Sequence, residues 1–148
     1  MQASSSETKF TPTALVVDDQ DFNREICRAI LEQTGYQVEE AEDGESALQK
    51  LEQRHFDMMI LDLHMSGMSG YQVLSQVRAK PGFEKLFVIV MTSHGPQITG
   101  ELHDVANRIM FKPIDFKSFT LFAASFKKTL EEGGAPASSD EVSTDSHT

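Results

Sequence analysis

Residues 58–62 read MMILD, four apolar side chains in a row followed by a carboxylate. A short apolar run without polar alternation is typical of a strand that is covered on both faces, as strands are in a parallel sheet. Four further segments have the length and composition of strands, at 13–17, 37–41, 86–91 and 108–111. Together with 58–61, they predict five short strands.

The intervals between these strands have the spacing of helices. The apolar positions at helical spacing are Phe22, Ile26, Ala29 and Ile30, then Ala47, Leu48 and Leu51, then Tyr71, Leu74 and Val77, and last Phe116, Phe119, Phe122, Phe126 and Leu130. The interval after 95–96 has the weakest pattern, because Gly100 interrupts it. We expect the phenylalanine stripe to pack in the core. Five strands alternating with five helices predict an α/β fold, a doubly wound five-stranded parallel sheet.

Composition excludes several classes of protein. The chain has 148 residues and a net charge of −10, so direct partners with phosphate backbones or anionic membrane surfaces are not expected. No apolar stretch approaches the roughly 20 residues of a membrane span, and the polar first ten residues do not fit a signal peptide. Cys27 is the single cysteine and cannot form an internal disulfide, which suits a cytoplasmic protein.

The two ends of the chain differ from its body. Residues 1–12 are rich in Ser and Thr, and residues 131–148 carry five acidic residues but no Lys, Arg or aromatic residue. Such segments cannot bury enough apolar surface to offset the entropy lost on ordering. We therefore expect one domain at 13–130 between two disordered segments. The acidic segment is interpreted as a tail or linker, with a partner-binding motif as the alternative.

Three carboxylates are predicted to meet at one edge of the sheet. Asp18 and Asp19 directly follow the first strand, and Asp62 ends the third. Ligands of doubly wound sheets bind beyond the carboxyl ends of the strands, where the strand order switches. Three acids in one pocket need a raised pKa or a cation, and oxygen ligands suit Mg²⁺ or Mn²⁺. In the alternative interpretation, Asp19 or Asp21 only caps the following helix.

Other strand ends add complementary groups. Thr92 places a hydroxyl after the fourth strand, and Lys112 places an ammonium after the fifth. Pro113 holds Lys112 in an extended conformation, and a cis Lys112–Pro113 bond is a plausible way to aim the lysine. The backbone carbonyl of His64, two residues beyond Asp62, is a further candidate ligand for the metal. Acids, hydroxyl and ammonium together indicate a site for a metal and a phosphate group.

Five motifs resemble the receiver domain of two-component response regulators. They are LVVDD at 15–19, AEDGESAL at 41–48, MMILDLHMSGMSG at 58–70, VIVMTS at 88–93 and FKP at 111–113. The resemblance covers residues 13 to about 130. It implies the flavodoxin-like (βα)5 receiver fold.

The resemblance also implies a role for each site residue. Asp62 would accept a phosphoryl group from a phosphohistidine. Asp19 would bind Mg²⁺ directly and Asp18 through water. Thr92 would donate a hydrogen bond to the phosphoryl group, and Lys112 would pair with its oxygens. The donor would be a histidine kinase or a histidine phosphotransfer protein.

Phosphorylation would then switch the surface formed by the fourth helix, fifth strand and fifth helix. The expected partner of this surface is a downstream effector protein, and a homodimer is possible through the same face. The family resemblance implies no enzymatic activity apart from catalysis of the domain's own phosphorylation and dephosphorylation.

The sequence departs from the family pattern at several positions. Ser66 replaces the usual proline four residues after the acceptor, and Ile109 replaces the usual aromatic residue three before the lysine. Phe111 is an aromatic residue nearby. His64 and His94 stand two residues past Asp62 and Thr92. They are either exposed loop residues or residues that control the access of water to the phosphoryl group.

Three alternative readings remain open. Asn23-Arg24 resembles receivers attached to histidine kinases, so the chain could be one receiver of a hybrid kinase. Ile109 and Ser66 leave room for an interaction module of the same fold that is never phosphorylated. A Mg²⁺-dependent phosphatase with an aspartyl nucleophile is a distant third; its chemistry would favour a D-x-D arrangement after the first strand, and this chain reads DDQD at 18–21.

Overall fold

A computed structural model describes residues 10–93 and 100–133. The strands are β1 (Thr13–Val17), β2 (Gln37–Ala41), β3 (Met58–Asp62), β4 (Phe87–Thr92) and β5 (Arg108–Phe111). The helices are α2 (Asp21–Gln33), α3 (Gly44–Gln53), α4 (Gly70–Ala79), α5 (Gly100–Val105) and α6 (Phe116–Glu131). The alternation of strands and helices is the predicted one.

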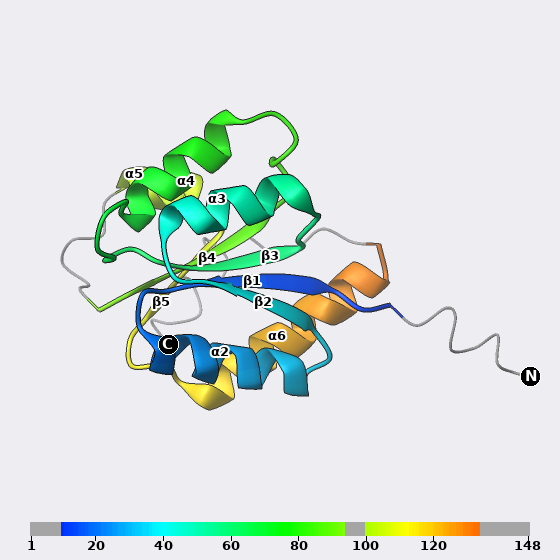
Figure 1. The fold of residues 1–148 in the computed structure, drawn as a ribbon. Coiled ribbons are helices and arrows are strands. Elements are labelled where there is room, and N and C mark those ends of the chain that lie inside the picture. Colours follow the sequence, from blue (N-terminus) through cyan, green and yellow to red (C-terminus); the bar gives the residue numbers. More distant parts are fainter. Residues whose placement is uncertain (1–9, 94–99, 134–148) are drawn as a thin grey trace, which may run out of the picture.

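The five strands form one parallel sheet in the order β2-β1-β3-β4-β5. Helices α2 and α6 cover one face, and α3, α4 and α5 cover the other (Figure 1). The predicted doubly wound five-stranded sheet is therefore confirmed. The chain moves outward from β1 to β2, then crosses back to place β3 on the other side of β1. This reversal makes the carboxyl ends of β1 and β3 the switch point of the sheet.

The core consists of two apolar layers separated by the sheet. Met58 and Ile60 of β3 pack toward α2 and α6, whereas Met59 and Leu61 pack toward α3 and α4. All five residues of β3 are buried. Two buried faces explain why this segment is a continuous apolar run.

Phe22 and Phe116 depart from the predicted helix faces. The stripe of α6 is buried at Phe119 and Phe126, but Phe116 is 57% exposed, and Phe22 of α2 is 70% exposed. Both exposed rings lie in the first turn of their helix, Phe22 at the second residue of α2 and Phe116 at the first residue of α6. The core prediction was therefore wrong for Phe116.

Smaller differences concern Ala29 and Tyr71. Ala29 is exposed and Tyr71 is 40% exposed, because the buried faces of α2 and α4 are centred on other residues. These residues are Cys27, Ile30 and Leu31 in α2, and Val73, Leu74 and Val77 in α4. Gly100 is the first described residue of α5, and the residues before it that belong to the predicted helix lie outside the described ranges.

The predicted disordered ends fall almost entirely outside the described residues, except that α6 continues to Glu131. Among the described residues, every helix is too short or too polar to traverse a lipid bilayer.

Helix α4 begins in direct contact with the end of β3. Ser69 and Gln72 form a capping box, in which the Ser69 hydroxyl accepts from the Gln72 amide and the Gln72 side chain accepts from the Ser69 amide. A Cβ atom on Gly70 would lie 2.2 Å from the carbonyl oxygen of Asp62 and 2.7 Å from Cα of Leu63. Only glycine allows this approach of two backbones.

We expect Gly70→Ala to destabilise the fold by about 1–3 kcal/mol, the usual cost of forcing an extra methyl group into a packed site. The free energy of unfolding in urea measures this loss. Ser75→Ala, on the exposed face of the same helix, is the matched control and should change stability little. Equal stability of the two variants would contradict the contact between Gly70 and Asp62.

Candidate functional site

Three carboxylates gather at the switch point of the sheet. One carboxylate oxygen from each of Asp18, Asp19 and Asp62 can be chosen so that all three lie within 4.8 Å of one another. Asp18 is only 5% exposed and Asp62 only 3%, while Asp19 is half-buried. The predicted convergence of these three acids is therefore present. Like charges at this spacing repel each other strongly in a buried setting.

Backbone amides fix two of the carboxylates. Oδ1 of Asp18 accepts a hydrogen bond from the Gln20 amide at 2.9 Å, and Oδ1 of Asp62 accepts one from the His64 amide at 3.1 Å. Each bond closes a short turn directly after a strand. These bonds fix the orientations of the two side chains. The His64 amide and the Lys112 ammonium both contact Oδ1 of Asp62, and neither of these two contacts involves Oδ2.

The third carboxylate is held from a different loop. Oδ2 of Asp19 accepts from the backbone amide of Ser66 at 3.0 Å and from its hydroxyl at 3.4 Å. The N-cap of α2 is Gln20, which makes no side-chain capping bond. Asp19 and Asp21 are therefore not helix caps, and the capping alternative is wrong.

Lys112 supplies the positive charge of the site. Its Nζ lies 3.2 Å from Oδ2 of Asp18 and 3.4 Å from Oδ1 of Asp62. The Lys112–Pro113 peptide bond is cis, the isomer that the sequence made plausible. One ammonium among three carboxylates leaves a formal charge of −2. Hard oxygen donors with this excess of charge fit a divalent cation such as Mg²⁺ or Mn²⁺.

The pKa of Asp62 is raised above its ordinary value. Burial is the main cause, and the negative charge of Asp18 acts in the same direction. The His64 amide and Lys112 oppose the shift without cancelling it. The ionised form of Asp62 is therefore held in the fold at a cost in free energy.

Thr92 lies beside this cluster as the last residue of β4. It is 1% exposed, and its carbonyl accepts from the Lys112 amide at 2.9 Å, which ties the ends of β4 and β5 together. Ile109 packs against the core on the α3–α5 side, while Phe111 is 52% exposed. His64 is exposed, and His94 lies outside the described residues.

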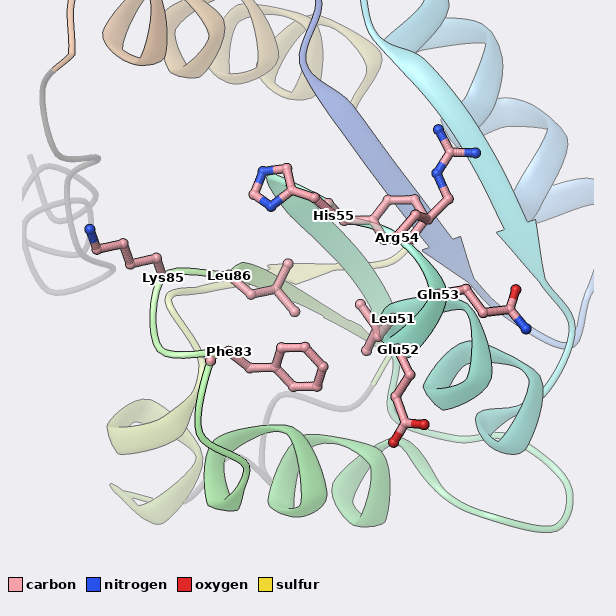
Figure 2. Close-up of a pocket in the computed structure, with 10 residues that line it drawn as sticks. Leu51, Glu52, Gln53, Arg54, His55, Phe83, Lys85 and Leu86 are labelled. Atoms are coloured by element: carbon pink, nitrogen blue, oxygen red, sulfur yellow. The ribbon is translucent and has the colours of Figure 1, made fainter.

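Two cavities lie near the ends of the sheet. A cavity of about 450 Å³ adjoins Asp19 and is lined mainly by acidic residues and the loop of Ser66. Figure 2 shows the other, of about 310 Å³, between the end of α3 and the segment before β4, with Arg54, His55 and Lys85 around it. None of the three clustered carboxylates lines this second cavity. The clustered carboxylates therefore belong with the cavity beside Asp19, at the carboxyl ends of the strands.

Sequence reasoning missed two contacts of the site. Ser66 was recognised only as a departure from the family, yet its amide holds Asp19. Gly70 was not singled out, although its missing side chain allows α4 to approach Asp62. A replaced proline is the available signal for Ser66, since proline has no N–H to donate. Nothing in the sequence pattern distinguishes Gly70 from other helix-starting glycines.

Comparison with known proteins gives consistent results. The family model described as response regulator receiver domain matches residues 14–123. The transcriptional regulatory protein ResD of Bacillus subtilis is 36% identical over 93 residues, which are 63% of this chain and 36% of that protein. The sensor histidine kinase AruS of Pseudomonas aeruginosa is 41% identical over 64 residues, which are 43% of this chain and 6% of that protein.

A solved structure extends the similarity to the fold. The response regulator TrrA of Thermotoga maritima, in complex with Mg(2+)-BeF, is 30% identical and has a TM-score of 0.69. The similarity covers 79% of this chain and 97% of that one. By contrast, the chain spans about a third of the length of ResD and a small part of AruS.

The raised pKa of Asp62 leads to a stability prediction. At neutral pH without divalent cations, we expect Asp62→Asn to raise the Tm by a few degrees, because it removes an ionised group that the fold disfavours. A group with a raised folded pKa weakens the fold only when ionised. The gain should therefore vanish as the pH falls below the ordinary value of 3.8. Thermal unfolding between pH 3 and 8 measures this.

Asp104→Asn, at an exposed carboxylate of α5, is the control and should shift the Tm little at any pH. A lower Tm for Asp62→Asn at neutral pH would contradict the electrostatic cost assigned to Asp62.

Proposed function

The chain belongs to the response regulator receiver domain family, and we propose from this that it is a phosphoacceptor switch whose acceptor is Asp62. The observation that carries the proposal is the meeting of Asp18, Asp19 and Asp62 with Lys112 at the switch point of the sheet. A set of three acids, two of them buried, that faces a lysine favours binding and transfer of a phosphoryl group over structural stabilisation.

In the proposed transfer, an Asp62 oxygen attacks the phosphorus atom of a phosphohistidine. Oδ2 is favoured, because Oδ1 is already engaged by the His64 amide and Lys112. The new O–P bond forms as the N–P bond breaks, and the donor imidazole keeps the electron pair and takes up a proton. An anionic nucleophile and an anionic donor repel each other, so Lys112 neutralises part of the charge.

Asp18, Asp19 and Asp62, with the backbone carbonyl of His64, are the proposed ligands of Mg²⁺ or Mn²⁺. The all-oxygen donor set and its excess negative charge support this assignment. Such a metal supplies charge neutralisation and orientation for the transferring phosphoryl group. The complex of the related TrrA with Mg(2+)-BeF is a further reason to expect Mg²⁺ here.

The product is proposed to be read by the face of α5, β5 and α6. The Thr92 hydroxyl would donate a hydrogen bond to the phosphoryl oxygens, and Lys112 would pair with these oxygens. These contacts would move the segment that follows β4 toward the phosphoryl group. Two of these elements carry exposed apolar side chains, Phe111 of β5 at 52% and Leu121 of α6 at 62%. A downstream effector protein, or a second copy of the chain, is the proposed partner.

The donor is proposed to be a histidine kinase or a histidine phosphotransfer protein. The proposed location of the chain is the cytoplasm. We propose that the domain has no enzymatic activity beyond its own phosphorylation and dephosphorylation. Residues 13–130 are the proposed domain, and 131–148 a linker or tail. The similarity to part of AruS supports the variant in which the chain is a receiver of a hybrid kinase. The unphosphorylated module is the competing proposal.

The proposed function predicts one phosphoryl group per chain after incubation with Mg²⁺ and a small-molecule phosphodonor. Intact mass spectrometry measures the adduct. Asp62→Asn should give none, and removal of Mg²⁺ with a chelator should reduce the wild-type yield at least tenfold, since charge neutralisation by the metal is worth several kcal/mol.

An adduct on Asp62→Asn as large as on the wild type would place the acceptor elsewhere. The absence of both the adduct and Mg²⁺ binding in the wild type would favour the unphosphorylated module.

A further inference from the structure

Ser66 occupies a distinctive place in the site. It follows Asp62 by four residues, in the loop that connects β3 with α4, at the position where related receivers usually have proline. Its amide and its hydroxyl both point to one oxygen, Oδ2 of Asp19, at 3.0 and 3.4 Å. Proline could make neither contact, because it has no N–H and no hydroxyl.

We propose that Ser66 is a positioning residue for the metal site, and that its backbone N–H holds Asp19 in the orientation needed to bind a divalent cation. This inference rests on the proposed function, because it concerns the proposed ligand Asp19. The amide engages Oδ2 and leaves Oδ1 of the same carboxylate available to an ion.

Asp19 depends on this contact more than its two neighbours depend on theirs. Asp18 and Asp62 are almost fully buried and both contact Lys112, so packing and charge restrain them. Asp19 is only half-buried. Within residues 10–93 and 100–133, the hydrogen bonds to its side chain come from Ser66 alone.

The loop that carries Ser66 is closed at both ends. The Gly70 amide donates to the Leu63 carbonyl at 3.0 Å, and Ser69 caps α4. Between these anchors, Gly67 has a φ of +74°, a conformation that favours glycine. The contact with Asp19 links the middle of this loop to the end of β1. Hydrogen-bond partners of ligating groups fix ligand orientation, and their loss typically weakens metal binding about 10–100-fold.

The test compares two substitutions that remove different groups. Ser66→Pro removes both the N–H and the hydroxyl, whereas Ser66→Ala keeps the N–H and removes only the hydroxyl. We expect Ser66→Pro to raise the Kd for Mn²⁺ at least tenfold, by the loss of a ligand's hydrogen-bond partner. Ser66→Ala should stay within about twofold of the wild type, since its amide still holds Asp19. Isothermal titration with Mn²⁺ alone, confirmed by electron paramagnetic resonance of the free ion, gives the three Kd values.

A second measurement does not depend on how Ser66→Pro folds. The amide resonance of Ser66 in the metal-free wild type should shift and lose protection from hydrogen exchange in Asp19→Ala, because the acceptor has gone. An unchanged Ser66 amide in Asp19→Ala would overturn the proposal. Circular dichroism and urea unfolding establish that each variant is folded before its Kd is interpreted.

The outcomes separate this inference from the proposed function. If the wild type binds Mn²⁺ and folded Ser66→Pro binds equally well, the positioning role is wrong while the phosphoacceptor proposal stands. If Ser66→Ala loses as much affinity as Ser66→Pro, the hydroxyl is the anchor and the assignment to the amide is overturned. If the wild type binds no divalent cation, the proposed function itself fails.

Discussion

The repulsion among three carboxylates at the ends of β1 and β3 is the constraint on which the rest of the site depends. Asp18 and Asp62 are almost completely buried, so water cannot screen their charges well. Each is held by a backbone amide and shares the single ammonium of Lys112. The residual negative charge raises the free energy of the folded state, and a bound divalent cation would lower it. The fold is thereby less stable at the place where we propose that a cation binds.

The topology explains why this charge gathers at one place. Strands that all run in the same direction end at the same edge, and the switch in strand order leaves a crevice there. Helices cover both faces of the sheet, so the strand interiors must be apolar on both sides. Polar chemistry is therefore confined to the strand ends. Acids from β1 and β3 meet there with Lys112, which follows the edge strand β5.

Much of this arrangement could be predicted from the sequence, because apolar periodicity and strand-end residues are local features. The strands at 13–17, 37–41 and 108–111 agree with the structure residue for residue. Periodicity alone does not say whether the first turn of a helix is covered by the rest of the fold, and Phe116, in the first turn of α6, is exposed. The bond from Ser66 to Asp19 joins residues 47 positions apart. It depends on the conformation of a loop, which residue type alone does not specify.

Serine at position 66, where the family resemblance implies proline, gives the loop after β3 a different kind of restraint. Proline restricts a loop by fixing its own φ, independently of any neighbour. Ser66 is instead tied through a hydrogen bond to Asp19, so the order of the loop and the orientation of the carboxylate depend on each other. A cation bound at the proposed ligand Asp19 would therefore act also on the loop, and by thermodynamic reciprocity the loop would act on the affinity for that cation. This loop leads directly into the Gly70 contact with Asp62, so we expect the same coupling to reach the proposed acceptor.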